Sequence, residues 1–461
     1  MSSSKEAIVP ESRIPTQESA APSGAETAGS TGSRWQAGVR ALRHRNFQLF
    51  FSGQLISLIG TWMQSVAQSW LVYRLTGSAL LLGSVGFASQ IPVFLFAPLG
   101  GITADRFNRR YIVISTQIAA MVLASILAAL TLSHAIDHRV WLIFVLAGLL
   151  GVVNAFDIPG RQSFLVEMVG RDDLMNAIAL NSSMFNGARV IGPAIAGILV
   201  AKIGEGWCFF ANAVSYIAVI IGLLLMNVHS PVRAAMASPL EHMMEGFRFV
   251  ERTAPIKALL LLLGLVSLVG MPYVVLMPIF ADQILHGGAR GLGILMGATG
   301  VGALFGALTL AFREGVKGLG RWVAWCCAGF GASLVVFALS HTFWLSVLLL
   351  LPVGYSMMLQ MACSNTLIQV MVPDALRGRV MAVYSMMFMG MAPIGALLGG
   401  VLADRLGAPR TVAMGGLACL LGAGWFALHL PKIRVEARRL IVAQAAGGGE
   451  PAEMTAQAVE D

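Results

Sequence analysis

The amino-acid sequence predicts an all-α membrane protein with twelve transmembrane helices, in two pseudo-symmetric six-helix bundles with both termini in the cytoplasm. Composition gives the class: of 461 residues, 57% are hydrophobic and 12% are charged, with a mean hydropathy of +0.76. A soluble domain carries roughly 25% charged residues. The apolar runs then give the number of helices, and the distribution of Lys and Arg gives their orientation.

Residues 1–46 are expected to form a disordered cytoplasmic tail, because their first 33 residues are rich in Ser, Ala, Thr, Pro and Gly. Twelve apolar runs follow, each near the roughly 20 residues that cross about 30 Å of hydrocarbon. They cover residues 47–73, 79–102, 111–133, 140–160, 174–201, 207–227, 258–281, 291–312, 322–340, 343–364, 378–402 and 411–430. We therefore expect bundles over 47–228 and 258–430, a central cytoplasmic loop over 229–257 and a cytoplasmic tail over 431–461.

Lys and Arg orient the helices, since these residues gather at the cytoplasmic ends of membrane spans. In the predicted topology, 22 of them lie on the side of the two termini and six on the opposite side. This arrangement accounts for the net charge of +8 without a nucleic-acid partner. All five cysteines lie in apolar runs, which argues against a disulfide framework and a cysteine metal site.

The two halves of the chain resemble each other. A shift of 203 residues, without a gap, superposes four glycines: Gly187 on Gly390, Gly192 on Gly395, Gly197 on Gly400 and Gly204 on Gly407. The fifth and eleventh predicted helices are therefore repeat partners. A transporter built from two halves around a central site has this kind of repeat.

The connection after the second predicted helix carries the most specific motif. Residues 100–110 read GGITADRFNRR, with Asp105-Arg106 followed by the basic pair Arg109-Arg110. This motif resembles the signature of the major facilitator superfamily, and it implies the major facilitator fold. Asn108 stands where the family usually has glycine; because asparagine tolerates the left-handed conformation, we expect the turn to be kept.

Further motifs extend the resemblance over residues 47–430. They are Gly60-Thr61-Trp62-Met63-Gln64, Leu75-Thr76-Gly77-Ser78, Asp157-Ile158-Pro159-Gly160-Arg161, Arg189-Val190-Ile191-Gly192-Pro193 and Arg377-Gly378-Arg379. Together they resemble the transmembrane secretion effectors, the branch of the superfamily that includes enterobactin-exporter-like and macrolide-efflux-like proteins. The resemblance implies a secondary active transporter that exports a small organic compound, a siderophore or a drug-like molecule, by alternating access driven by proton influx.

The resemblance also implies a gate at the cytoplasmic mouth. Its residues would be Gly101, Asp105, Arg106, Arg109, Arg110 and Arg379. Asp105 would face the amino end of the eleventh helix near Arg379, where the helix dipole favours a carboxylate by about 0.3–1 kcal/mol when exposed. For the three arginines after Asp105, simple anchoring of the helix ends in the cytoplasm is the alternative.

Arg189 lies near the middle of a predicted span, where an arginine costs roughly 2.5–3.5 kcal/mol on translocon scales. It should therefore face a water-filled cavity or a partner, and Asp157 is the nearest candidate acid. Asp157, with Arg161 one turn later, is also the preferred proton carrier, ahead of Glu167. The first predicted helix has no acid, and residues 140–156 lack the arginine that the family usually has there. Substrate or proton handling and a structural ion pair both stay open for Arg189.

A polar stripe on the first predicted helix indicates a cavity. Its residues, at steps of three and four, are Gln54, Ser57, Thr61, Gln64, Ser65 and Gln68. Such a stripe is costly against lipid, so we expect Gln54, Thr61, Gln64 and Gln68, with Gln90 and Asn181, to line a cavity; interhelical hydrogen bonding is the alternative.

Gly192, Pro193 and Gly395 are expected to act as hinges, because proline removes a helical hydrogen bond and permits a bend. Ordinary kinks without a gating role are the alternative for these positions.

Other functions stay open within this architecture, notably uptake or lipid flipping. A membrane receptor or enzyme is disfavoured, because the sequence has no clustered metal ligands, no G-x-x-x-x-G-K-[ST] loop and no long patterned tail. We expect no catalytic residue, metal or cofactor. The expected partners are a small-molecule substrate, protons and the lipid bilayer, with the protein acting as a monomer in the bacterial cytoplasmic (inner) membrane.

Overall fold

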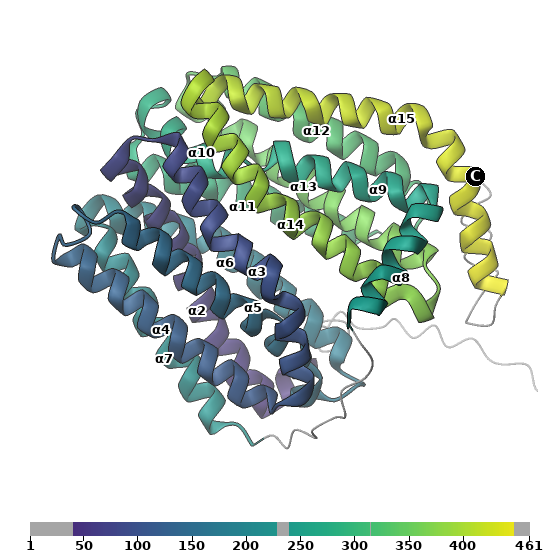
Figure 1. The fold of residues 1–461 in the computed structure, drawn as a ribbon, viewed down its shortest axis with the longest axis horizontal. Coiled ribbons are helices and arrows are strands. Elements are labelled where there is room, and N and C mark those ends of the chain that lie inside the picture. The colour runs from purple at the N-terminus through teal and green to yellow at the C-terminus, as the bar shows by residue number, and fades with distance from the viewer. Residues whose placement is uncertain (1–39, 228–238, 314, 447–461) are drawn as a thin grey trace, which may run out of the picture.

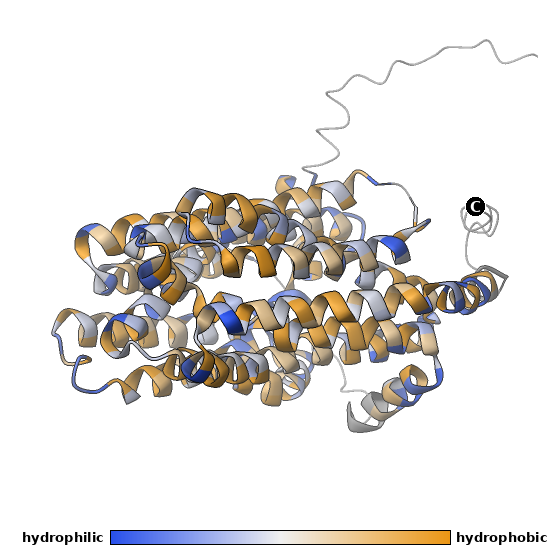
Figure 2. Cartoon of the chain, turned by 90° about the horizontal axis from the view of Figure 1, so that it is seen from above, coloured by the Kyte–Doolittle hydropathy of each residue, from blue (hydrophilic) through white to orange (hydrophobic). Residues whose placement is uncertain are grey.

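The computed structural model describes residues 40–227, 239–313 and 315–446, and helices make up nearly all of them (Figure 1). Within these ranges, eleven helices are long and apolar enough to cross a membrane. Hydrophobic residues predominate along the helices (Figure 2). The prediction of an all-helical membrane protein is therefore confirmed.

The helices of the first half begin after a 3₁₀ turn, η1 (Arg40–Arg43). They are α2 (Arg45–Thr76), α3 (Ala79–Arg106), α4 (Arg109–Leu132), α5 (Trp141–Val169), α6 (Leu174–Ile203) and α7 (Glu205–Leu225). Those of the second half are α8 (Pro239–Arg252), α9 (Ala254–Leu265), α10 (Tyr273–Ile279), α11 (Gly288–Ala311), α12 (Leu319–Leu339), α13 (Phe343–Met371), α14 (Asp374–Leu406) and α15 (Ala408–Ala446). Many of these helices run past the predicted apolar runs, because a helix continues beyond the hydrocarbon that the runs measure.

Helix α2 is 32 residues long but is not among the eleven apolar helices. Its polar residues lower its hydropathy, and Gln54, Ser57 and Gln64 are buried. The helix packs on α6 and α7, so these side chains are kept from lipid. By length and composition, eleven of the described helices can therefore span a membrane, whereas the apolar runs in the sequence predict twelve spans.

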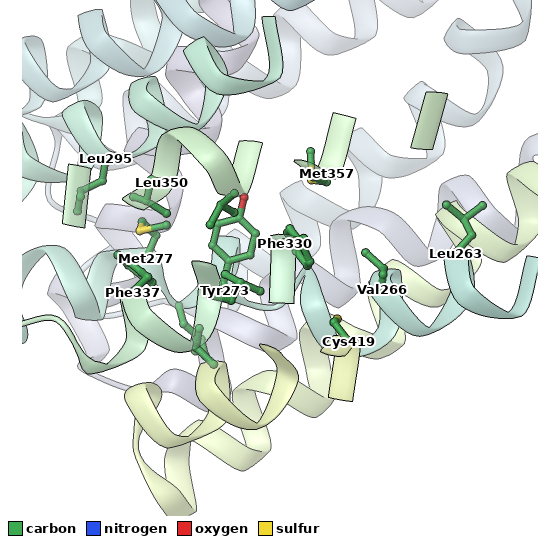
Figure 3. Close-up of a cluster of buried hydrophobic side chains, with 14 of the residues drawn as sticks. Leu263, Val266, Tyr273, Met277, Leu295, Phe330, Phe337, Leu350, Met357 and Cys419 are labelled. Atoms are coloured by element: carbon green, nitrogen blue, oxygen red, sulfur yellow. The ribbon is translucent and has the colours of Figure 1, made fainter. Parts of the chain in front are cut away.

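The seventh predicted span is interrupted. A π-helical turn, η2 (Val266–Gly270), follows α9; a turn at residues 271–272 leads to α10; and a second π turn, η3 (Phe280–Ile284), ends the segment. Pro272 lacks an N–H group and cannot continue the helical hydrogen bonds. The break sits in an apolar core, where the Tyr273 ring packs edge-on against Phe330 (Figure 3).

α6 and α14 run unbroken through Pro193 and Gly395, and the hinge role of Gly192, Pro193 and Gly395 stays a prediction. The two glycines allow close packing. A Cβ on Gly192 would lie 2.5 Å from the Cβ of Trp62, and one on Gly395 would lie 2.5 Å from the carbonyl oxygen of Leu268. Gly192 and Gly395 thus let α6 approach α2, and α14 approach the segment that follows α9.

Two segments predicted as loop and tail contain helix. The central connection holds α8, whose Phe247, Phe249 and Val250 pack with the core of the second half. The last helix, α15, continues through Pro431 to Ala446. Apolar run length cannot reveal an amphipathic helix of this kind. Most of the tail predicted over residues 1–46, residues 1–39, lies outside the described part of the chain.

Asp173, just before α6, holds the start of the described chain. Its carboxylate lies 2.8 Å from Nε2 of His44 and 2.6 Å from Nη2 of Arg40. The hydrogen bond with His44, followed by that from Arg40, holds the pKa of Asp173 below its usual range despite the effect of burial. The contact fixes η1 against the connection between α5 and α6.

The two halves meet at glycines that the internal repeat relates. A Cβ on Gly197 of α6 would lie 2.9 Å from Cα of Gly293 in α11. In the same way, a Cβ on Gly400 of α14 would lie 2.9 Å from Cα of Gly83 in α3. Gly197 and Gly400 are superposed by the shift of 203 residues, so the internal repeat produces two equivalent backbone contacts.

These contacts lie at one end of the molecule. We call the other end, which holds residues 105–110 and Arg379, the basic end. The hydrogen bond from Tyr73 to Asp282, 2.7 Å long, joins the halves at the end opposite the basic one. From that end, the contact between α3 and α14 extends to Phe94, whose ring would lie 2.5 Å from a Cβ on Gly390. Beyond this contact the two halves diverge toward the basic end (Figure 1).

The glycine contact between α6 and α11 predicts that Gly197→Ala lowers the apparent melting temperature in detergent. The added methyl group would meet backbone, and overpacking of this kind costs typically about 1–3 kcal/mol. Gly187→Ala on the same helix is the control, because no atom lies within 4 Å of a Cβ there. That variant should gain roughly 0.5–1 kcal/mol from helix propensity. Equal melting temperatures for the two variants would contradict the proposed role of the contact.

Candidate functional site

A cavity of about 350 Å³ lies between the two halves. Its polar lining comes from the first half, with the amides of Gln64, Gln68, Gln90, Asn154 and Asn212. The second half contributes apolar side chains: Val274, Val275, Met296 and Met389. Every lining residue that the structure describes is uncharged. The site suits a ligand that forms hydrogen bonds on one side and apolar contacts on the other.

The polar stripe of α2 divides between two environments. Of the residues expected to line a cavity, Thr61, Gln64, Gln68 and Gln90 do so, whereas Gln54 and Asn181 are not among its lining residues. Gln54 is buried, and its Oε1 has no hydrogen-bond partner. Gln64 accepts a hydrogen bond of 2.7 Å from Nδ2 of Asn212 on α7. Cavity lining and interhelical hydrogen bonding thus occur on the same stripe.

Arg189 is not among the lining residues of this cavity, but it lies over one of them, Trp62. Its guanidinium carbon is 5.6 Å from the centroid of the Trp62 ring, in a cation–π contact. Phe185, one turn earlier on α6, packs edge-on against the same ring. Asp157, expected as the nearest acid, does not reach Arg189.

Asp157 is engaged in a network between α4 and α5 instead. Its Oδ2 lies 2.7 Å from Nε of Arg161, and its Oδ1 accepts hydrogen bonds from Thr116 and Gln117 at 2.8 and 2.9 Å. The residue is 3% exposed. The structure therefore brings Asp157 and Arg161 together and places Arg189 in a different environment.

The motif at the basic end fixes the corner between α3 and α4. Arg109 Nη1 lies 2.8 Å from Oε1 of Glu167, and both side chains are largely buried. Arg110 donates to the carbonyl oxygens of Leu223 and Leu224 at the end of α7. A cation at the carboxyl end of a helix is favoured by the dipole. These two arginines thus hold the first half together.

The gating role of Gly101, Asp105 and Arg106 stays a prediction, because the halves diverge at the end where the gate would close. Asp105 is exposed, and its closest cation is Arg109, one turn later, at 3.7 Å. Arg106 is also exposed, and a Cβ on Gly101 would meet nothing within 4 Å, whereas one on Gly100 would lie 2.0 Å from the carbonyl oxygen of Ala155. Asn108 has a φ of −62°, so it is not left-handed; it caps α4 by accepting from the N–H of Arg110.

Arg379 pairs with a residue of the central connection rather than with Asp105. Its Nη1 forms an ion pair with Oε2 of Glu245 on α8. The backbones are also close there, since a Cβ on Gly246 would lie 2.7 Å from the carbonyl oxygen of Arg379. Among the described residues, no ion pair joins Asp105 to α14, and α8 lies beside Arg379 instead.

Residues 36–446 match the family model described as transmembrane secretion effector. The chain belongs to this family of the major facilitator superfamily. It is therefore a membrane transporter of the major facilitator type, and the resemblance noted in the sequence is confirmed. The family consists of transporters, not enzymes.

Relatives with stated functions cover most of this transmembrane secretion effector. It is 27% identical over 397 residues to the staphyloferrin A transporter of Staphylococcus aureus, covering 84% of this chain and 97% of the relative. It is 28% identical over 386 residues to the multidrug efflux pump Tap of Mycolicibacterium fortuitum, with 81% and 93% coverage. It is 26% identical over 408 residues to the enterobactin exporter of Shigella boydii, with 88% and 96% coverage.

Solved structures share the fold. A bacterial homologue of the iron transporter ferroportin, in an inward-facing state, has a TM-score of 0.65 at 18% identity, covering 83% of this chain and 98% of that one. A transporter of the POT family in complex with 5-aminolevulinic acid has a TM-score of 0.69 at 12% identity, with 84% and 96% coverage. At these identities the likeness concerns the fold alone.

Three contributors to the site were not predicted from the sequence. Thr116 and Gln117 donate hydrogen bonds to Asp157. They form a polar pair inside the apolar run 111–133, and this pair could have indicated a buried polar partner. Glu245 lies in a charged segment with no feature that distinguishes it from its neighbours.

The Asp157 network predicts a loss of stability in Asp157→Asn. The substitution leaves Arg161 without its counter-charge, and an unsatisfied buried group costs about 1–3 kcal/mol. The apparent melting temperature should fall, and adding Arg161→Gln should restore part of the loss because the unpaired charge is then removed. If the double variant melts no higher than Asp157→Asn, the ion pair is not the origin of the loss.

The Arg379–Glu245 ion pair predicts that Glu245→Gln favours closure at the basic end, because it releases Arg379 from α8. A partly exposed ion pair contributes about 0.2–1 kcal/mol, which corresponds to a population shift of up to about fivefold. Spin-label distances between the basic ends of α3 and α14 would measure this shift. Arg377→Gln is the control, since Arg377 pairs with Asp374 on its own helix. An unchanged distance distribution in Glu245→Gln would contradict the role of this ion pair.

Proposed function

We propose that this protein is a secondary active exporter that moves a small organic compound, a siderophore or a drug-like molecule, out of the bacterial cytoplasm by alternating access. The observation that carries the proposal is a cavity between two halves that are packed together at one end and diverge toward the other. A rocking motion that exchanges the closed end would expose the same cavity to the other side.

The proposal includes the topology predicted from the sequence. Twelve spans, with α2 as the first, form bundles over residues 47–228 and 258–430, and the basic end faces the cytoplasm by the positive-inside rule. The open end of the cavity is then the cytoplasmic one, so the structure corresponds to a state that loads from inside the cell. The protein acts as a monomer in the inner membrane.

The relatives support the choice of substrate class. Their names state transport of staphyloferrin A, efflux of drugs and export of enterobactin. The cavity agrees with an organic molecule rather than a bare inorganic ion, because it offers amides, Trp62 and methionines and has no charged lining residue.

Proton coupling is assigned to Asp157. Its hydrogen-bond donor Thr116 also lines a groove of about 500 Å³ beside Asn108 and Tyr111, near the basic end, which offers a path for protons. On the other side, its neighbours on α5, Asn154 and Ile158, line the central cavity. Protonation would weaken the pair with Arg161 and alter the packing of α5 next to the substrate. Glu167 is the weaker candidate, because Arg109 holds it.

Accumulation of labelled siderophores and antibiotics in an exporter-deficient bacterial host tests the function. Expression of the wild-type protein should lower the accumulation of at least one compound, and a protonophore should restore it. The double variant Asp157→Asn with Arg161→Gln should lose this gradient-dependent export. Asp172→Asn, an exposed acid before α6, is the matched control and should retain it. Raised accumulation on expression would indicate uptake, and no change for any compound would contradict export of these classes.

A further inference from the structure

Arg189 is a cation that the described protein does not neutralise. Asp157 is bound by Arg161, Thr116 and Gln117. Asp282 accepts a hydrogen bond from the Tyr73 hydroxyl, and Glu205 forms an ion pair with Arg74. Among the described residues, no acid forms an ion pair with Arg189; its guanidinium lies over the face of Trp62 and also interacts electrostatically with Tyr273. A charged group in this position is expected to have a functional counter-ion.

Backbone contacts on α6 set the position of this cation. Gly192 brings α6 against α2 at Trp62, and Arg189 lies one turn earlier on the same face of α6. On the opposite side, a Cβ on Gly300 of α11 would lie 3.0 Å from the carbonyl oxygen of Arg189. Arg189 therefore sits where the packed part of α6 begins, at the inner limit of the space that opens toward the basic end.

The cavity beside Arg189 has the complementary chemistry for an anion. No lining residue among those described bears a carboxylate that would compete for the guanidinium. Gln64 and Gln68 offer amide donors, and Trp62 offers an aromatic face. A guanidinium binds a planar carboxylate through two parallel hydrogen bonds, a geometry that lysine cannot reproduce.

We propose that the transported compounds are small organic anions, and that Arg189 binds their carboxylate while Trp62 and the apolar wall of the second half hold the remainder. This inference rests on the proposed transport function and narrows its substrate class. The guanidinium lies over Trp62, and a bound anion would take over as its partner.

Equilibrium binding to the full-length protein in phosphatidylcholine nanodiscs tests the inference. The probes are dansylglycine, a carboxylate, and dansylglycinamide, its neutral counterpart with the same body; empty nanodiscs correct for partition into lipid. The wild-type protein should bind the carboxylate about tenfold to a hundredfold more tightly than the amide, the range expected for a charge-assisted pair. No preference for the carboxylate in the wild type, including no binding at all, would overturn the proposal.

Variants locate the preference. Arg189→Gln should bind the two probes equally, Arg189→Lys should keep part of the preference, and the exposed Arg171→Gln is the control and should match the wild type. A preference that survives in Arg189→Gln would assign the anion site to other residues. If Arg189→Gln binds neither probe, Arg189→Lys decides: a reduced preference with normal amide binding supports the site, and an unchanged preference contradicts it.

A spectroscopic readout separates ligand binding from a structural role. Dansylglycine should change the tryptophan fluorescence of the wild type by removing the guanidinium from Trp62, and Trp62→Phe should lack this component. The assay needs no ion gradient, so it is independent of transport. Selective binding without export of any compound would contradict only the transport function. Undiminished export of compounds by Arg189→Gln would contradict only the anion site.

Discussion

Two backbone contacts at glycines hold the halves of the molecule together, and the rest of the structure depends on them. α6 meets α11 and α3 meets α14 with no side chain between the Cα atoms of Gly197 and Gly293, or of Gly400 and Gly83. In lipid, apolar side chains gain little by meeting each other, so the close fit of small residues drives such association. Because the contacts are repeat-related, they close one end evenly and leave the cavity accessible from the other.

Two buried ion pairs stabilise the first half of the molecule. Asp157 and Arg161 neutralise each other between α4 and α5, and Arg109 does the same with Glu167 at the corner of the first half. Satisfied groups of this kind stabilise a single packing arrangement. Arg189 forms no ion pair with a described acid, and it lies over Trp62, which lines the cavity.

Sequence reasoning found the helices because the thickness of the bilayer fixes the length of an apolar run, and it found Gly197 and Gly400 because the repeat preserves small residues where backbones touch. It did not identify the partners of charged residues that lie on different helices. The pairing of Asp157 with Arg161 was available from their spacing of four residues, whereas the separation of Asp157 from Arg189 depends on which way two helices face. α8 was missed because its apolar face is discontinuous in sequence, and Glu245 at Arg379 could be recognised only once α8 was placed.

The two halves line the cavity with different kinds of side chain, and this difference affects how they move relative to a bound molecule. Hydrogen-bonding groups come from α2, α3, α5 and α7, whereas the second half presents Val274, Val275, Met296 and Met389. Apolar contacts have no preferred direction, so they can be exchanged by sliding, while hydrogen bonds must be broken one by one. A bound molecule would therefore stay hydrogen-bonded to the first half while the second half slides over it. The free-energy barrier to reorientation would then include little of the binding energy.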